Sequence, residues 1–380
     1  MFTERLANWL ARSSANRSIN QPIEINAVLS SDIGLVRNEN QDVIAAMRVN
    51  TPTNAGKSFV AMALLDGMGG MQDGKQCASI ALSTFFFSLI RFRSAPLESR
   101  LKNAVLEAND AVYKFANGQG GSTLSAIIIE HGSSPVTVNV GDSRIYSFNY
   151  PEGLKAVSSD DSLEALGGRG RGLLQFIGMG ESIKPHIKSL EEKDSNIILT
   201  SDGTHFISQE AFQQILLHSP NFKVSAQRIA EYVRWCGAHD NASFGYINCE
   251  DIKNNLINHK EIGVELWDPF GNLHIMWMKN YPSDQNYFSQ NIVDDPENKS
   301  VKNTIKETGN NALVNEGNID NKKTEESQGD LFVNEAKKVK SSSTKAVKSR
   351  KPRAKKAIGK KENEDNSVMI NISSGENNDD

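Results

Sequence analysis

Residues 59–70, FVAMALLDGMGG, decide the fold of this chain. Seven of the eight residues from Phe59 to Asp66 are apolar, and the eighth is a carboxylate. An apolar run of this length that ends in glycine predicts a strand buried on both faces. Asp66 stands where this strand ends, and the glycines after it allow the backbone to approach a ligand closely. A carboxylate in this setting suits a hard cation, although an Asp-Gly turn also commonly ends a strand without any ligand.

The bulk composition predicts one large domain with polar additions. The chain has 380 residues and an apolar content of 38%, which is low for a fully folded chain of this length. The apolar runs are concentrated between residues 20 and 250, and almost none occur after residue 290. We therefore expect four segments: an N-terminal amphipathic segment (1–19), a main domain (20–250), a β-hairpin extension (251–283) and a disordered charged tail (284–380).

The end of the chain carries two blocks of opposite charge. Residues 337–361 contain twelve lysines and arginines and no acid, whereas residues 362–380 contain six acids and no base. Such blocks are usually solvated, so we interpret the tail as a tether. Its basic block offers nucleic acid only weak, salt-dependent phosphate contacts. A protein that acts mainly through this tail is therefore an alternative hypothesis.

Cysteine use and hydropathy predict a cytoplasmic location. The three cysteines, Cys77, Cys236 and Cys249, form no C-x-x-C pair, and their number is odd, which favours a reducing compartment. No apolar run approaches the ~18 residues of a membrane span. Residues 1–14 lack the continuous apolar core of a signal peptide. We expect a cytoplasmic monomer with no membrane contact.

Periodicity along the chain predicts strands and helices in alternation. A short amphipathic helix over residues 2–12 packs on the main domain, and residues 150–185 form a long irregular flap. The expected strands lie at 23–31, 43–47, 59–66, within 118–130 after a glycine-rich turn, at 134–148 (a pair) and within 195–203 before Asp-Gly, with a last core strand, ASFGYIN, at 242–248. The expected helices lie at 75–93, 98–117, 208–218 and 223–236, and a hairpin is expected at 263–278, either at a sheet edge or as a docking element.

Five isolated acids share one local context, the start or end of a strand beside a glycine or an amide residue. They are Asp42, Asp66, Asp142, Asp202 and Asp240. If the fold brings them together, they cannot all remain ionised without cations. Oxygen ligands without a His/Cys cluster favour Mg²⁺ or Mn²⁺ over Zn²⁺.

Six short motifs occur in a fixed order along residues 20–250. They are RNENQD (37–42), DGMGG (66–70), GST (121–123), GDSRIY (141–146), LTSDG (199–203) and DN (240–241). Each motif is weak alone, but together they resemble the metal-dependent protein phosphatases of type 2C, in their bacterial form. The resemblance implies an α+β fold, a four-layer α/β/β/α sandwich of two antiparallel sheets flanked by helices, with metals in a cleft at one end.

The resemblance also implies a binuclear site of two Mg²⁺ or Mn²⁺ ions. Asp66 matches the carboxylate that bridges the two metals, and Gly67 matches the residue that lends its carbonyl. Asp202 and Asp240 match the remaining direct ligands. Asp42 matches the acid that holds water bound to the metals.

Two further residues match parts of the family's site. Asp142, with Asp202, matches a weaker site for a third ion, and its alternative role is that of a structural turn acid. Arg37 matches the arginine that binds the substrate phosphate, because a guanidinium fork fits two phosphate oxygens. Its alternative is a solvated or salt-bridging arginine. Arg37 and Asp66 are thus the catalytic candidates.

The chain departs from the family pattern at three places. Met68 stands where the eukaryotic members have a histidine that donates a proton to the leaving group. Residues 160–162 read Asp-Asp-Ser, where the family often has Asp-His-Ser. His205 follows the LTSDG motif, and we interpret it as a packing or surface residue rather than an acid. Ser122 and Thr123 we interpret as structural residues near the site.

The expected function is hydrolysis of phosphoserine and phosphothreonine in proteins. The resemblance implies direct attack on phosphorus by a water that bridges the metals, without a phosphoenzyme. The expected partner is a phosphoprotein, such as a cognate Ser/Thr kinase or its targets. A pseudophosphatase that binds phosphoproteins with little turnover is the alternative, although every direct-ligand carboxylate is present.

Overall fold

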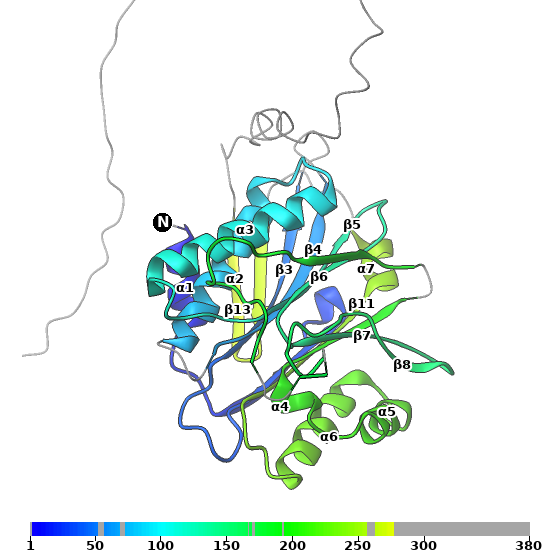
Figure 1. Cartoon of the computed structure of the whole chain (residues 1–380). Helices are drawn as coiled ribbons and strands as arrows, with labels where there is room; N and C mark the ends of the chain where they lie inside the picture. Colours follow the sequence, from blue (N-terminus) through cyan, green and yellow to red (C-terminus); the bar gives the residue numbers. More distant parts are fainter. Residues whose placement is uncertain are drawn as a thin grey trace, which may run out of the picture. The chain divides into compact units, whose positions relative to one another are not determined.

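In the computed structural model, two antiparallel β-sheets lie face to face with helices on both outer sides (Figure 1). The structure describes residues 2–51, 57–68, 73–165, 167–168, 172–191, 194–256 and 263–276. The expected tail at 284–380 lies outside the described residues, as do Gly69 and Gly70. Among the described residues the architecture is the predicted α+β sandwich.

All strand pairs in both sheets are antiparallel. In the described part of the chain the first sheet has the order β1 (Arg17–Asn20), β2 (Ala27–Asp32), β11 (Ala242–Asn248), β10 (Asn196–Thr200), β7 (Arg144–Asn149) and β8 (Gly153–Ala156). The second has the order β13 (Gly271–Met276), β12 (Gly263–Asp268), β3 (Asp42–Asn50), β4 (Phe59–Asp66), β5 (Leu124–Glu130), β6 (Val136–Val140) and β9 (His186–Ser189).

Helices pack on the outer face of each sheet, except α7 (Cys249–Asn255), whose Cys249 and Ile252 join the core between the sheets. Along the described residues they are α1 (Phe2–Leu10), α2 (Gly74–Arg91), α3 (Leu97–Ala116), α4 (Asp202–His205), α5 (Gln209–Leu217), α6 (Phe222–Trp235) and α7 (Cys249–Asn255). In Figure 1, α1, α2 and α3 lie on the side of β3 and β4, whereas α4, α5 and α6 lie on the opposite side of the sandwich. None of the helices in the described ranges is long and apolar enough to cross a membrane.

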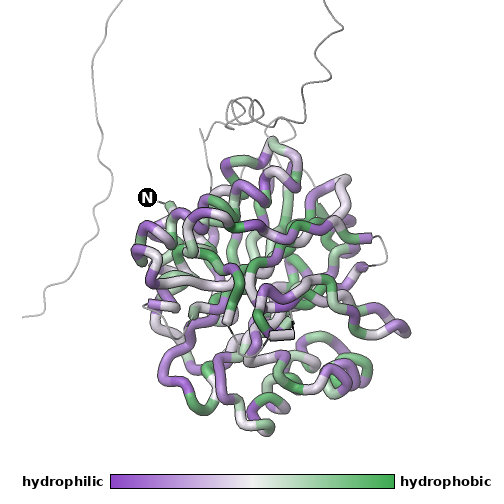
Figure 2. Tube along the Cα trace, viewed as in Figure 1, coloured by the Kyte–Doolittle hydropathy of each residue, from purple (hydrophilic) through white to green (hydrophobic). Residues whose placement is uncertain are grey.

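Strand β4 is buried on both faces, as its apolar run predicts. Val60, Met62 and Leu64 face the core between the sheets. Phe59 and Leu65, which have the other parity, pack in the core beneath α2 and α3. Each large side chain buried in this way contributes about 1.5–3 kcal/mol. Figure 2 shows the resulting pattern, with hydrophobic residues along the strands and hydrophilic stretches in the outer loops.

The N-terminal helix and the hairpin at 263–276 both lie on the side of the second sheet, the helix on α2 and the hairpin in the sheet itself. Helix α1 packs on α2, which confirms the expected amphipathic helix. Strand β12 pairs with β3 from Gly263↔Asn50 to Trp267↔Ala46, so the hairpin extends the sheet. Arg12 joins the two additions, because its Nη2 donates to Oδ1 of Asp268 at 2.9 Å.

The structure corrects the sequence prediction in the weakly patterned segments. Residues 23–25 form a 3-10 helix (η1, Ile23–Ile25) rather than the start of a strand, and β2 begins at Ala27. The segment at 150–185 is not wholly irregular, because it contains β8. The edge strands β1 and β9, of four residues each, were not predicted. Short edge strands carry too few residues for a periodic signal.

Candidate metal centre

Strand register places Asp42 and Asp66 opposite each other. Asp42 is the first residue of β3, Asp66 is the last residue of β4, and the two are paired across the ladder. Directly opposed residues project from the same face of a sheet and have neighbouring side chains. The fold therefore brings two of the five predicted acids together at one end of the second sheet.

The other three acids lie at the same end of the sandwich. Asp142 lies in the turn between β6 and β7, Asp202 follows β10, and Asp240 lies two residues before β11. Strands β7, β10 and β11 are consecutive neighbours in the first sheet, and Thr200 at the end of β10 pairs with both Arg144 and Phe244. The antiparallel order thus puts these strand ends on one side.

Burial and mutual repulsion raise the pKa values of three of the acids. Burial raises the pKa of Asp66 well above its ordinary value, and the charges of Asp42, Asp202, Asp142 and Asp240 raise it further. Burial likewise raises the pKa of Asp42 to about 7, against hydrogen bonds from serines that lower it. The pKa of Asp142 rises to about 6, first through burial and then through the charge of Asp202. The five acids therefore form one electrostatic cluster.

Hydroxyl groups hold the backbone and side chains of this cluster. Ser201 donates from its Oγ to Oδ2 of Asp42 at 2.8 Å. Thr123 Oγ1 accepts the backbone N–H of Asp66 at 2.9 Å and lies 2.7 Å from Ser143 Oγ. Thr123 is therefore a structural residue beside the site, as interpreted from the sequence.

Arg37 lies at the rim of the cluster and bonds one of the predicted ligands. Its Nη2 donates to Oδ2 of Asp240 at 2.6 Å, and its side chain is 42% exposed. This hydrogen bond is the main reason why the pKa of Arg37 is raised. Asn241 holds the loop that carries Arg37, because its Oδ1 accepts from Gln41 N at 2.8 Å and its Nδ2 donates to Glu39 O at 3.0 Å.

Two motif glycines are explained by close backbone packing. A Cβ atom at Gly203 would lie 2.0 Å from the carbonyl oxygen of Asn241. A Cβ atom at Gly67 would lie 2.3 Å from the carbonyl oxygen of Gly74 and 3.0 Å from that of Gln41. Only glycine lets the Asp202 turn approach the Asp240 loop, and the Asp66 turn approach the start of α2, this closely.

The donor chemistry of the cluster fits a hard divalent cation. Its side-chain donors are carboxylate oxygens, and Oδ1 of Asp42 is buried without a hydrogen-bond partner among the described residues. Among the residues that the structure describes, however, no three Asp, Glu, His or Cys side chains lie close enough together to hold an ion in their present positions.

Several residues of the site were not predicted from the sequence. Lys75, at the start of α2, donates from Nζ to the Asp42 carbonyl at 3.3 Å, and burial lowers its pKa. Ser201 and Asn241 adjoin predicted ligands within motifs, and their polar types were the available signal. Lys75 had no such signal, because a single lysine before an apolar helix is common.

The flap is attached to the turn that carries Asp142. Arg144 forms a forked ion pair with Asp160, with Nη2 2.8 Å from Oδ2. Asp161 accepts the backbone N–H of Gly141 at 2.9 Å, and its other oxygen lies 2.7 Å from Nε2 of His186. Asp161, the second acid of the Asp-Asp-Ser sequence at 160–162, thus supplies a second anchor for the flap.

His205 is removed from proton chemistry by its surroundings. Its Nδ1 lies 2.9 Å from Oγ1 of Thr200, and burial lowers its pKa to about 3. The imidazole is therefore neutral at physiological pH. This agrees with its interpretation as a packing residue.

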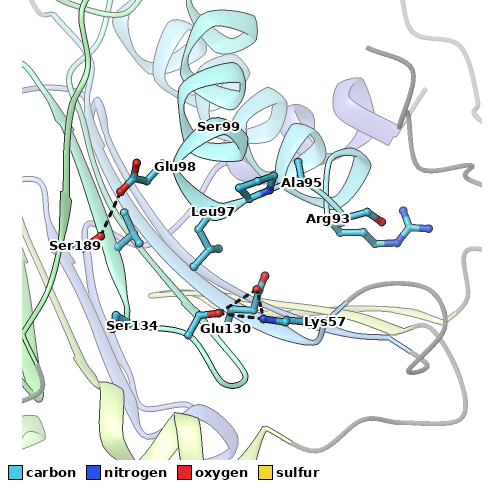
Figure 3. A pocket seen from close by; sticks show the side chains of 13 residues that line it. Lys57, Arg93, Ala95, Leu97, Glu98, Ser99, Glu130, Ser134 and Ser189 are labelled. Carbon is cyan, nitrogen blue, oxygen red and sulfur yellow. Dashed lines mark hydrogen bonds and ion pairs between the residues drawn. The ribbon is translucent and has the colours of Figure 1, made fainter. Parts of the chain in front are cut away.

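A surface pocket lies at the other end of β4, remote from the acids. It has a volume of about 650 Å³ and is lined by residues that include Lys57, Leu97, Glu98 and Glu130 (Figure 3). Glu130 pairs with Phe59, the first residue of β4, whereas Asp66 is the last, roughly 23 Å away along the strand. In this pocket Lys57 pairs with Glu130 at 3.4 Å.

Among the comparisons with known proteins, only the search of solved structures gives matches, and these show similarity of fold. No family model and no curated protein matches the chain. MsPP, a PPM Ser-Thr phosphatase from Mycobacterium smegmatis solved with cacodylate, is 24% identical with a TM-score of 0.48, and the match covers 58% of this chain and 97% of that chain. Stp1, a serine/threonine phosphatase from Staphylococcus aureus, is 20% identical with a TM-score of 0.48, covering 59% and 94%. The catalytic domain of PstP, solved with two manganese ions, is 25% identical with a TM-score of 0.47, covering 59% and 97%.

Proposed function

We propose that this chain is a metal-dependent phosphatase that hydrolyses phosphoserine and phosphothreonine in proteins. The observation that carries the proposal is the convergence of five carboxylates at one end of the sandwich, three of them with a raised pKa, and an exposed arginine at their rim. Carboxylates that repel one another in a partly buried site are stabilised in their ionised form when cations bind between them.

The acids would hold the cations, and Arg37 would bind the phosphate. Asp66, Asp202 and Asp240, with the Gly67 carbonyl, are the proposed direct ligands of two Mg²⁺ or Mn²⁺ ions, and Asp42 supports them. Asp142 is the proposed ligand of a third, weaker ion. Bound divalent cations supply activation of water at neutral pH and stabilisation of charge on the transferring oxygens.

Arg37 has two uses for its guanidinium in this arrangement. In the structure it pairs with Asp240, and its 42% exposure leaves it accessible from solvent. A phosphate that approaches the rim offers oxygens that match the guanidinium fork. If Asp240 held a cation, Arg37 would be free to bind the phosphate, and the pair would then couple ion binding to substrate binding.

No side chain that the structure describes is assigned to protonate the leaving group. Met68 has no proton to donate, and the neutral, buried His205 is engaged with Thr200. Solvent at the rim is the proposed source of this proton. The proposal therefore predicts that neither Met68 nor His205 contributes a titration to the rate.

The test is hydrolysis of p-nitrophenyl phosphate and of a phosphothreonine peptide with Mn²⁺, with and without a chelator. We expect turnover that is lost in the chelator and reduced at least about 100-fold in Asp66→Asn. Equal rates in the variant and the wild type, or no metal-dependent turnover, would contradict the proposal. Binding of the phosphopeptide without turnover would instead assign the chain as a pseudophosphatase.

A further inference from the structure

Two surface segments run side by side next to Arg37. Arg234, at the end of α6, lies 3.4 Å from the Gly34 carbonyl through its Nη1. Leu35 N donates to the Ala238 carbonyl at 2.9 Å, and Arg37 pairs with Asp240. The segment of residues 34–37 therefore follows the segment of residues 234–240 in the same direction, and both end at the acidic cluster.

Three large apolar side chains on these two segments are exposed. Leu35 is 55% exposed, Val36 is 65% exposed, and Trp235 is 82% exposed. We call Leu35, Val36 and Trp235 the apolar ledge. Exposed apolar groups that gather in one place mark interaction sites, and tryptophan is among the residues that contribute most to binding.

The contacts made by one face of α6 show where Trp235 lies. Glu231, one helical turn earlier on the same face, bonds Arg17 Nη1 at 2.8 Å. The neighbouring residue Asn16 accepts from the backbone N–H of Ile33 at 2.8 Å. The end of α6, with Trp235 at its last position, therefore lies beside the start of the 34–37 segment.

The backbone beneath the ledge is tightly held. A Cβ atom at Gly34, which has a φ of +84°, would lie 2.4 Å from the Asp240 carbonyl oxygen and 2.7 Å from that of Ala238. Arg234 also donates to Oδ1 of Asp32 at 2.9 Å. The backbone beside Leu35 is therefore held in place before binding, which lowers the entropy lost on binding.

We propose that the apolar ledge docks apolar side chains of the substrate polypeptide that flank the phosphorylated residue. This inference rests on the proposed function, because Arg37 sets the position of the phosphate. A peptide whose phosphate reaches Arg37 has the ledge directly beside it. On the ledge it buries Leu, Ile, Val or Phe side chains against Val36, Leu35 and Trp235. The substrate class is a phosphoprotein with apolar residues within a few positions of the phosphorylated one.

The test compares Trp235→Ala with wild type on two phosphothreonine peptides, one with leucines and one with lysines beside the phosphorylated residue. The readouts are kcat/KM relative to that for p-nitrophenyl phosphate, and peptide affinity by fluorescence anisotropy. We expect the wild type to prefer the leucine peptide, and Trp235→Ala to lose at least about fivefold of that preference. Val36→Ser provides a second, smaller change in the same direction.

Tyr150→Ala is the matched control. Tyr150 is 81% exposed and also aromatic, but it lies beyond the end of β7, whereas Asp142 and Arg144 lie at the start of that strand. The control should leave the peptide preference as it is in the wild type. An equal preference in the wild type, Trp235→Ala and Tyr150→Ala would overturn the inference, as would Trp235-dependent binding to lipid vesicles without any peptide preference.

The two readouts separate this inference from the proposed function. Absence of p-nitrophenyl phosphate hydrolysis in the wild type contradicts the proposed phosphatase. Anisotropy still reports the ledge in that case, because peptide affinity does not require turnover. A leucine-peptide affinity that falls in Trp235→Ala supports the docking surface with or without catalysis.

Discussion

Replacing Asp42 by asparagine should stabilise the metal-free protein above neutral pH. Burial raises the pKa of Asp42 to about 7, whereas its ordinary value, which applies in the unfolded chain, is 3.8. The folded state therefore holds this proton more tightly than the unfolded state. Stability falls as the pH rises from about 4 to about 7, and the penalty is complete above that range.

The size of the effect follows from the pKa difference and one hydrogen bond. A shift of about three pH units corresponds to about 4 kcal/mol of destabilisation in the wild type. The asparagine oxygen still accepts the Ser201 hydroxyl, but its N–H group takes the buried position of Oδ1, which has no partner among the described residues. That unsatisfied donor costs about 1–3 kcal/mol. The net gain is about 1–3 kcal/mol, a rise in Tm of several degrees.

The assay is thermal unfolding in EDTA at pH 8 and at pH 4, with Asp110→Asn, an exposed acid on α3, as the control. We expect Asp42→Asn to be more stable than the wild type at pH 8 and less stable at pH 4. With saturating Mn²⁺ at pH 8 the order should reverse, because the variant lacks a charged oxygen that supports the ions. A variant that is equally destabilised at both pH values in EDTA would refute the electrostatic argument.

Three further predictions concern the turn beside the site, the buried histidine and the charged tail. Gly203→Ala should lower turnover at least about 100-fold, because its Cβ would meet a backbone oxygen at 2.0 Å and separate Asp202 from Asp240. The control is Gly263→Ala, whose Cβ meets nothing within 4 Å, and similar rates for both variants would contradict the packing argument. His205→Gln should remove a pH dependence of stability, because the pKa of His205 is lowered to about 3 in the folded protein, whereas in the unfolded chain the imidazole takes up a proton below its ordinary pKa of 6.5. The free energy of unfolding of the wild type, measured by urea titration, should therefore fall by about 2 kcal/mol between pH 7.5 and 5, and that of the variant should not. Deletion of residues 290–380 should keep p-nitrophenyl phosphate turnover within about twofold, because every proposed ligand precedes residue 241; a collapse of turnover would show that the tail belongs to the catalytic unit.

The sequence predicts the parts of the fold in which side-chain pattern and burial agree. Strand β4 and helix α2 are almost wholly buried, and their apolar runs identify them directly. The hairpin at 263–278 could also be predicted from its turn, but its position could not. Its pairing with β3 joins residues that are more than 200 positions apart, and such pairing leaves no trace in local periodicity.

The candidate site likewise has residues that the sequence identifies and contacts that only the fold reveals. Strand ends beside glycines identify the five acids, and the structure places them at one end of the sandwich. The Arg37–Asp240 pair and the Ser201–Asp42 bond join residues 203 and 159 positions apart, so only the fold reveals them. The same holds for Lys75 and for the Asp161 anchor, which depend on how α2 and the flap pack.

Exposed residues were the least predictable feature of function. Leu35 and Val36 lie in a loop that reads as polar from its neighbours, and Trp235 lies on an amphipathic helix whose apolar face is expected to be buried. Helical periodicity alone does not show that Trp235, the last residue of α6, lies outside the core. The apolar ledge is thus a product of where two segments meet.

The central claim is that the carboxylate cluster binds divalent cations. The most direct measurement is the number of Mn²⁺ ions bound to the wild type and to Asp66→Asn at pH 8, determined by equilibrium dialysis with electron paramagnetic resonance of the free ion. We predict two tightly bound ions in the wild type and the loss of at least one in the variant, because Asp66 is a buried acid whose pKa the charges of all four other acids raise. Absence of bound Mn²⁺ in the wild type, or equal binding in Asp66→Asn, would contradict the account.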